Sequence, residues 1–156
     1  MKYTLIRHGK TDANRLTRAA FGKQGAPLNH EGIVQTAALH ELLLAYDFNL
    51  TTEPTAVSTF LRTAQTAQFA GLQNIIAYPI LDEVKTPDPQ RTQQLIENKL
   101  LPPEAIEAAK RILVKPPIER IWVTHGLVIA AVQHLLGTTI EDRFIIDFCE
   151  IVEIEL

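Results

Sequence analysis

The sequence alternates between short apolar runs and longer amphipathic or alanine-rich stretches. Apolar runs bounded by polar or turn-forming residues predict strands at 2–7, 55–59, 74–81, 120–124 and 148–156. Stretches with helical periodicity lie between them, at 30–48, 61–71, 90–99, 104–115 and 126–137. Strands that alternate with helices favour an α/β fold. We therefore expect a three-layer α/β/α sandwich with a mainly parallel central sheet.

Individual residues indicate where these elements begin and end. Asn29 is a suitable N-cap for the first helix, and Gly71 is placed to follow the C-terminus of the second. Pro79 has no backbone N–H, so it can cut the third strand short. Residues 15–27 are punctuated by glycines and a proline and predict a loop. Residues 84–103 hold four prolines, and the sequence leaves open whether they form a mobile lid.

Length and composition restrict the class of protein. A chain of 156 residues favours one domain, spanning 1–156, and 46% hydrophobic residues suffice for a buried core. No run approaches the roughly 18 apolar residues of a membrane span, and the first residues lack the pattern of a signal peptide. Cys149 is the only cysteine, which excludes an internal disulfide and a cysteine zinc site. We expect a cytoplasmic protein with no membrane partner.

The charge is distributed unevenly. The formal net charge of −3 disfavours nucleic acid as a partner. Residues 1–23 nevertheless hold six basic residues and one acid, a balance of +5, which leaves −8 for the remainder. The basic residues are Lys2, Arg7, Lys10, Arg15, Arg18 and Lys23. This cluster either forms a solvated basic loop or attracts an anionic ligand.

Polar residues with reactive side chains, and one glycine, lie at the ends of four of the predicted strands or shortly after them. In chain order they are Arg7, His8, Arg62, Asp82, Glu83, His125 and Gly126. The carboxyl ends of parallel strands lie at one edge of a sheet, where α/β proteins bind their ligands. We therefore expect these residues to converge on one site.

Two arginines and two histidines suit a tetrahedral oxyanion. Each guanidinium can donate two hydrogen bonds to one phosphate, and it stays charged. Gly126 begins a predicted helix, whose N-terminal N–H groups favour anions, and Asn14 can donate a further hydrogen bond. Phosphate fits this set best, although sulfate or a carboxylate also fits. No further cluster of metal-binding residues is evident, so we expect no metal.

A histidine in such a pocket can also react. Neutral imidazole is a competent nucleophile toward phosphorus, and flanking arginines favour the neutral form. A carboxylic acid at position 82 or 83 could protonate the leaving oxygen and later deprotonate water. The same residues could equally bind a phosphate ligand without catalysis.

Four stretches together resemble one family. They are LIRHGKTDAN (5–14), FGKQGAPLNHEGIVQTAAL (21–39), STFLRTAQTA (58–67) and WVTHGLVI (122–129). Their order and content are similar to the histidine phosphatase superfamily, with its phosphoglycerate mutase-like fold, and to its small phosphatase branch in particular. The similarity runs from residue 3 to about residue 136.

The resemblance implies a metal-independent phosphatase that needs no organic cofactor. It implies that His8 is the phosphorylated nucleophile and that Glu83 is the proton donor, with Asp82 as the alternative. It further implies that Arg7, Arg62 and His125 hold the phosphoryl group, with Asn14 assisting. Apart from the resemblance, Gly126 at a helix start and the positively charged Lys10 are further candidates for substrate binding. His30, His40 and His134 are expected to be structural or exposed.

The sequence also departs from the family pattern. Lys10 stands where the family commonly has Glu or Gln, and Leu127 replaces a glycine. The tryptophan-containing continuation after Glu83 is absent, and only 41 residues separate Glu83 from His125. We expect a small, open site that takes a phosphorylated small molecule or a phosphoprotein, including phosphohistidine. A phosphoglycerate-type mutase, which needs a lid, and a non-catalytic phosphate binder or scaffold are the alternatives. The oligomeric state stays open.

Overall fold

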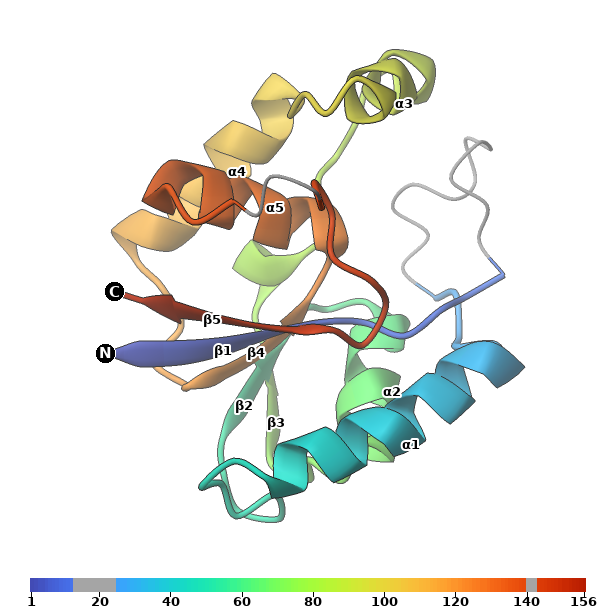
Figure 1. Ribbon diagram of the computed structural model, residues 1–156, viewed down its shortest axis with the longest axis vertical. Helices are drawn as coiled ribbons and strands as arrows, with labels where there is room; N and C mark the ends of the chain where they lie inside the picture. The colour runs from blue at the N-terminus through green and yellow to red at the C-terminus, as the bar shows by residue number, and fades with distance from the viewer. Residues whose placement is uncertain (13–24, 140–142) are drawn as a thin grey trace.

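The computed structural model describes residues 1–12, 25–139 and 143–156. Within these ranges, five strands form one sheet in the order β3-β2-β4-β1-β5 (Figure 1). Their bounds are β1 Lys2–Arg7, β2 Thr55–Val57, β3 Ile75–Ala77, β4 Ile121–Thr124 and β5 Ile151–Glu155. The first four pair in parallel, whereas β5 runs antiparallel to β1 at the edge of the sheet. The predicted mainly parallel sheet is confirmed.

Helices cover both faces of the sheet, which confirms the three predicted layers (Figure 1). Helices α1 (His30–Leu44) and α2 (Leu61–Phe69) lie on one face. Helices α4 (Pro103–Val114) and α5 (Gly126–Leu136) lie on the other, and α3 (Pro89–Glu97) lies beyond α4. No helix in the described part of the chain is both long and apolar enough to cross a membrane.

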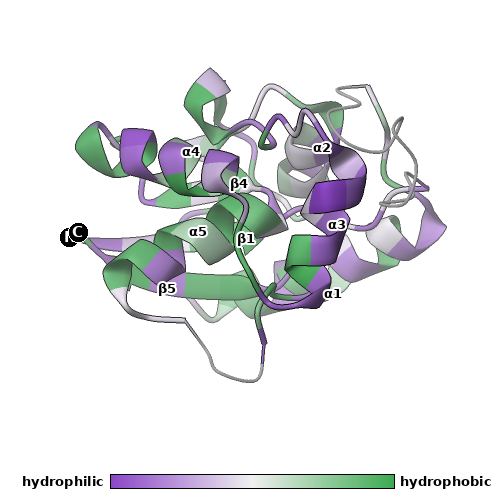
Figure 2. Ribbon diagram, turned by 90° about the horizontal axis from the view of Figure 1, so that it is seen from above, coloured by the Kyte–Doolittle hydropathy of each residue, from purple (hydrophilic) through white to green (hydrophobic). Residues whose placement is uncertain are grey.

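The central strands are apolar on both sides because each contributes to two cores. In β1, Leu5 packs with the α4–α5 core and Ile6 with the α1–α2 core. In β4, Trp122 packs with the α4–α5 core and Val123 with the α1–α2 core. Alternation of this kind gives the continuous apolar runs of a sheet buried on both faces. Apolar residues also predominate along α5 (Figure 2), whose residues 126–133 are all buried.

The ends of several elements were predicted correctly. The side chain of Asn29 accepts a hydrogen bond from the N–H of Gly32 at 2.8 Å, so it caps α1. Gly71 follows α2 with a φ of +93°, the left-handed conformation expected of a glycine after a helix. Of the loop predicted at 15–27, residues 15–24 lie outside the described residues.

Other predicted ends were wrong by several residues. The first helix ends at Leu44 rather than at 48, and the second strand ends at Val57 rather than at 59. The strand predicted at 74–81 covers only Ile75–Ala77, because Pro79 starts a 3₁₀ helix, η1 (Pro79–Leu81). The last strand begins at Ile151 rather than at 148, since Cys149 has a φ of +57° and leaves the extended conformation.

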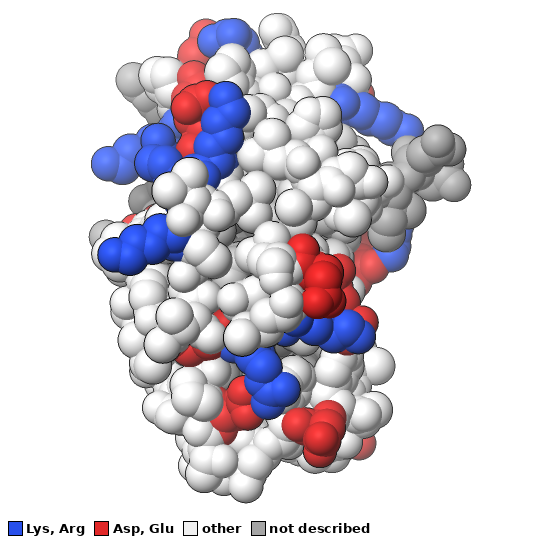
Figure 3. Space-filling model, turned by 90° about the vertical axis from the view of Figure 1, so that its left-hand side faces the viewer, with Lys and Arg blue, Asp and Glu red and all other residues white. Residues whose placement is uncertain are grey.

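Charged side chains of both signs are interspersed on the face in Figure 3. Exposed ion pairs join Lys110 to Glu107 at 2.9 Å and Arg120 to Glu53 at 3.1 Å. Surface charge at these positions is therefore balanced locally.

Candidate active site

The carboxyl ends of the parallel strands bring the predicted reactive residues together. His8 directly follows β1, His125 follows β4, and Arg62 lies in the first turn of α2, after β2. Glu83 comes after η1 instead of directly after a strand. All four side chains belong to one connected cluster, as the distances below show. Asn14 lies outside the described residues.

The ring of His8 is held in one tautomer. Its Nδ1 atom lies 2.7 Å from the carbonyl oxygen of Gly9, which can only accept a hydrogen bond. Nδ1 therefore carries the proton, and the lone pair is on Nε2. Arg62 donates from Nε to this Nε2 atom at 3.2 Å. His8 is buried and its Nε2 atom faces a cation, the arrangement that a neutral nucleophile for an anionic group requires.

Arg62 connects His8 to the carboxylate of Glu83. Its Nη2 atom lies 3.6 Å from Oε2 of Glu83, and its side chain is only 4% exposed. The Arg62 guanidinium also lies over the ring of Phe60, 4.7 Å from the centroid. Burial lowers the pKa of Arg62, and the charge of Glu83 opposes that shift.

The two predicted candidates for the proton donor occupy different surroundings. Glu83 Oε2 lies 3.5 Å from Nδ1 of His125, in addition to its contact with Arg62. Asp82 instead accepts hydrogen bonds from the backbone N–H and the hydroxyl of Thr59 at 2.7 and 2.8 Å. Glu83 thus lies beside the histidines. Asp82, directly after η1, is instead hydrogen-bonded to Thr59, which lies shortly before α2.

His125 is fully buried and neutral. Its Nε2 atom lies 2.9 Å from the hydroxyl of Ser58, and among the described residues its Nδ1 atom has no hydrogen-bond partner. Burial lowers the pKa of His125 well below 6.5, and His8, Arg62 and Arg7 lower it further. The approach of Nδ1 to Glu83 is therefore a contact of a neutral ring and not an ion pair.

Arg7 is placed by residues from the other end of the chain. Its Nη1 atom donates to the carbonyl oxygen of Ile146 at 2.6 Å, and its guanidinium lies over the ring of Phe148, 3.9 Å from the centroid. A Cβ atom on Gly126 would lie 2.8 Å from Nε of Arg7 and 2.7 Å from Ile145. The glycine at the start of α5 therefore leaves the space that the Arg7 side chain occupies.

The turn after His8 is fixed by backbone hydrogen bonds. The N–H of Gly9 donates to the Thr66 hydroxyl, and the N–H of Lys10 donates to the Gln35 side chain, both at 2.9 Å. The Lys10 ammonium pairs with Glu31 at 2.7 Å, at an exposed position on α1. The positive charge of Lys10 is therefore paired with an acidic neighbour, Glu31.

Comparisons with known proteins identify the family of the chain. The sequence model of the histidine phosphatase superfamily (branch 1) matches residues 3–104, about two thirds of the chain. The chain belongs to the histidine phosphatase superfamily. None of the curated proteins matches it.

Solved structures extend the likeness over the rest of this member of the histidine phosphatase superfamily. The protein TTHB049 from Thermus thermophilus is 26% identical, with a TM-score of 0.72 over 99% of this chain and 94% of that one. A mycobacterial glucosyl-3-phosphoglycerate phosphatase in complex with VO3 is 18% identical, with a TM-score of 0.69 over 97% and 90% of the two chains. The second likeness concerns the fold alone.

A cation site is the other chemistry that this cluster could support. Ligand atoms of His8, Glu83 and His125 lie within 4.8 Å of one another. However, the Arg62 guanidinium contacts two of these three residues, at His8 Nε2 and Glu83 Oε2. Because a bound cation would be repelled by that charge, the cluster suits an anion better. The absence of a metal from the reaction remains a prediction.

Sequence reasoning missed three residues of the histidine phosphatase site. Ser58 and Phe60 lie within the stretch STFLRTAQTA, but only their contacts with His125 and Arg62 give them a role. Phe148 was assigned to a strand, and nothing in the local sequence indicates that it contacts Arg7, 141 positions away.

Proposed function

We propose that this protein hydrolyses phosphomonoesters without a metal, through a covalent phosphohistidine at Nε2 of His8. The observation that carries the proposal is the state of the His8 ring, with Nδ1 bound to the Gly9 carbonyl and Nε2 facing Arg62. If the Arg62 guanidinium binds the phosphate, the phosphorus atom comes to lie next to the lone pair on Nε2 of His8, because that lone pair faces the same guanidinium.

The phosphoryl oxygens are held by three side chains in this proposal. Arg7 and Arg62 supply charged N–H donors, and the neutral His125 supplies Nδ1–H when the Ser58 hydroxyl donates to its Nε2 atom. The start of α5 at Gly126 adds the positive end of a helix. Asn14 and Lys10 remain candidates from the sequence alone.

The reaction then proceeds in two steps. Nε2 of His8 forms a bond to phosphorus while the bond from phosphorus to the ester oxygen breaks, and protonated Glu83 gives its proton to that oxygen. In the second step, Glu83 takes a proton from water as the water oxygen attacks phosphorus. The bond from phosphorus to Nε2 breaks, and inorganic phosphate and the free histidine result. The position of Glu83, in contact with Arg62 and His125 and with its carboxylate within 4.8 Å of a ring nitrogen of His8, supports this role.

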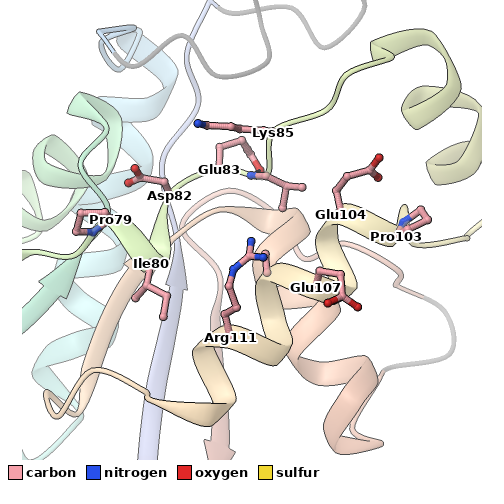
Figure 4. A pocket seen from close by; sticks show the side chains of 11 residues that line it. Pro79, Ile80, Asp82, Glu83, Lys85, Pro103, Glu104, Glu107 and Arg111 are labelled. Carbon is pink, nitrogen blue, oxygen red and sulfur yellow. Dashed lines mark hydrogen bonds between the residues drawn. The ribbon is translucent and has the colours of Figure 1, made fainter.

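We assign the leaving group to a surface hollow that includes Glu83 in its wall. It lies between η1 and α4 and has a volume of about 640 Å³. Figure 4 shows Arg111 pointing from α4 toward the segment that carries Glu83 and Lys85. Pro79, Ile80, Val84 and Ala108 make part of the wall apolar. An open hollow of this kind favours a small phosphate ester or a phosphorylated side chain.

Hydrolysis of phenyl phosphate in the presence of EDTA tests the proposal. We expect turnover by the wild type, none by His8→Ala, and unchanged turnover by His134→Ala, which alters an exposed histidine at the end of α5. A phosphorylated peptide containing His8, trapped by rapid quenching and identified by mass spectrometry, would place the covalent step. Equal turnover by wild type and His8→Ala would refute the assignment. Phosphate binding without turnover of any ester would favour the non-catalytic alternative.

A further inference from the structure

Residues 145–149, between α5 and β5, surround Arg7 on several sides. The Ile146 carbonyl accepts from Arg7 Nη1 at 2.6 Å, and the N–H of Cys149 donates to the Arg7 carbonyl at 3.0 Å. Between these two contacts, the ring of Phe148 lies 3.9 Å from the Arg7 guanidinium. The segment lies outside residues 3–104, which the family model matches.

The Phe148 ring restricts how the guanidinium can turn. A cation over an aromatic face is attracted by the ring, and a planar guanidinium then presents its N–H groups at its edge. The Ile146 carbonyl occupies part of that edge, so the orientation of the group is set by two independent contacts. The same ring lies 5.8 Å from the ring of His8, which places it beside the nucleophile as well.

Arg62 has a similar ring, but that ring also has a second role. Phe60 lies 4.7 Å from the Arg62 guanidinium, precedes the first residue of α2, and donates its N–H to the Ser58 hydroxyl at 3.2 Å. Replacing Phe60 would disturb a helix start. Phe148 is partly exposed and belongs to no helix or strand, so its contact with Arg7 can be tested by itself.

We propose that Phe148 is a positioning residue that orients the Arg7 guanidinium for the phosphoryl group. The inference rests on the proposed function to the extent that Arg7 binds phosphate. Phe148 acts through Arg7 and not by contact with the leaving group, so its effect is the same for every phosphate ester and for inorganic phosphate.

The test compares Phe148→Leu, which removes the aromatic ring, with Phe148→Tyr, which keeps it. For Phe148→Leu we expect the Kd of inorganic phosphate, measured by calorimetry, to rise about 3- to 30-fold, as loss of a cation–π contact implies. The KM values of phenyl phosphate and an alkyl phosphate should rise by the same factor. Phe148→Tyr should stay within about twofold of the wild type. Phe69→Leu, at an exposed position on α2, is the matched control and should change nothing.

Three results would overturn the inference. An increase in KM for phenyl phosphate alone, with unchanged phosphate binding, would mean that the ring contacts the leaving group. Equal losses in Phe148→Leu and Phe148→Tyr would mean that the side chain only packs, and unchanged binding in both would mean that it has no role. Phe148→Met replaces Phe148→Leu if thermal unfolding shows that the latter does not fold. Because binding of inorganic phosphate needs no turnover, the calorimetric comparison of the variants is independent of whether esters are hydrolysed.

Discussion

Nε of Arg62 lies 3.2 Å from Nε2 of His8, so a charged donor points at the lone pair of the proposed nucleophile. The same side chain reaches Glu83 through Nη2 at 3.6 Å. One buried arginine thus connects the proposed nucleophile with the proposed proton donor. An incoming phosphoryl group must take the place of the contact between Arg62 and His8, and the guanidinium would then bind its oxygens.

Replacing Arg62 with lysine tests this double contact. Lysine keeps the charge, but one ammonium cannot replace donors at both Nε and Nη2. We expect kcat/KM for phenyl phosphate to fall on the order of 10²- to 10³-fold, the usual effect of losing a preorganised donor. Arg91→Lys, at an exposed position on α3, should leave kcat/KM unchanged. A variant Arg62→Lys with near-normal kcat/KM would contradict the bridging role.

Glu83→Gln and Asp82→Asn separate the two candidates for the proton donor. Glu83→Gln should lower kcat for alkyl phosphates about 10²- to 10⁴-fold and lower it much less for p-nitrophenyl phosphate, whose leaving group needs no proton. Asp82→Asn should retain activity but lower the free energy of unfolding by about 1–3 kcal/mol, because it weakens the hydrogen bonds from Thr59. If Asp82→Asn instead lowered kcat for alkyl phosphates, and Glu83→Gln retained activity and lowered only the free energy of unfolding, Asp82 would be the proton donor.

Because His125 is buried and neutral, we expect the folded protein to lose stability in acid. Its pKa in the folded protein is well below the ordinary value of 6.5, so below pH 6.5 the unfolded chain binds a proton that the folded chain does not. The free energy of unfolding should therefore fall by about 1.4 kcal/mol per pH unit from this residue as the pH drops below 6.5. Urea denaturation at several pH values should show a shallower slope for His125→Gln. His134→Gln, an exposed control, should keep the wild-type slope.

Gly126→Ala tests whether the start of α5 needs a glycine to accommodate Arg7. The added methyl group would lie 2.8 Å from Arg7 Nε and 2.7 Å from Ile145, so one of these side chains must move. We expect phosphate to bind about 10-fold more weakly, as displacement of one charged hydrogen bond implies. Gly25→Ala is the control, because a Cβ atom there meets nothing within 4 Å. Phosphate binding that is equal in the two variants would exclude a need for glycine at 126.

Local sequence patterns were sufficient to predict the fold class and the convergence of His8, Arg62 and His125 at one edge of the sheet. The apolar runs of β1 and β4 and the cap at Asn29 are local, since backbone preference and burial periodicity determine them within a few residues. His8, Arg62 and His125 follow parallel strands, so the strand-end rule was enough to bring them together.

Tertiary structure decided what each of these side chains contacts. The choice of Glu83 over Asp82 as the proposed proton donor depends on the neighbours of each carboxylate. Asp82 accepts hydrogen bonds from Thr59, whereas Glu83 lies beside Arg62. The contact of Phe148 with Arg7 joins residues 141 positions apart. No local pattern encodes such a contact, because it exists only once β5 pairs with β1 and brings the end of the chain beside its beginning.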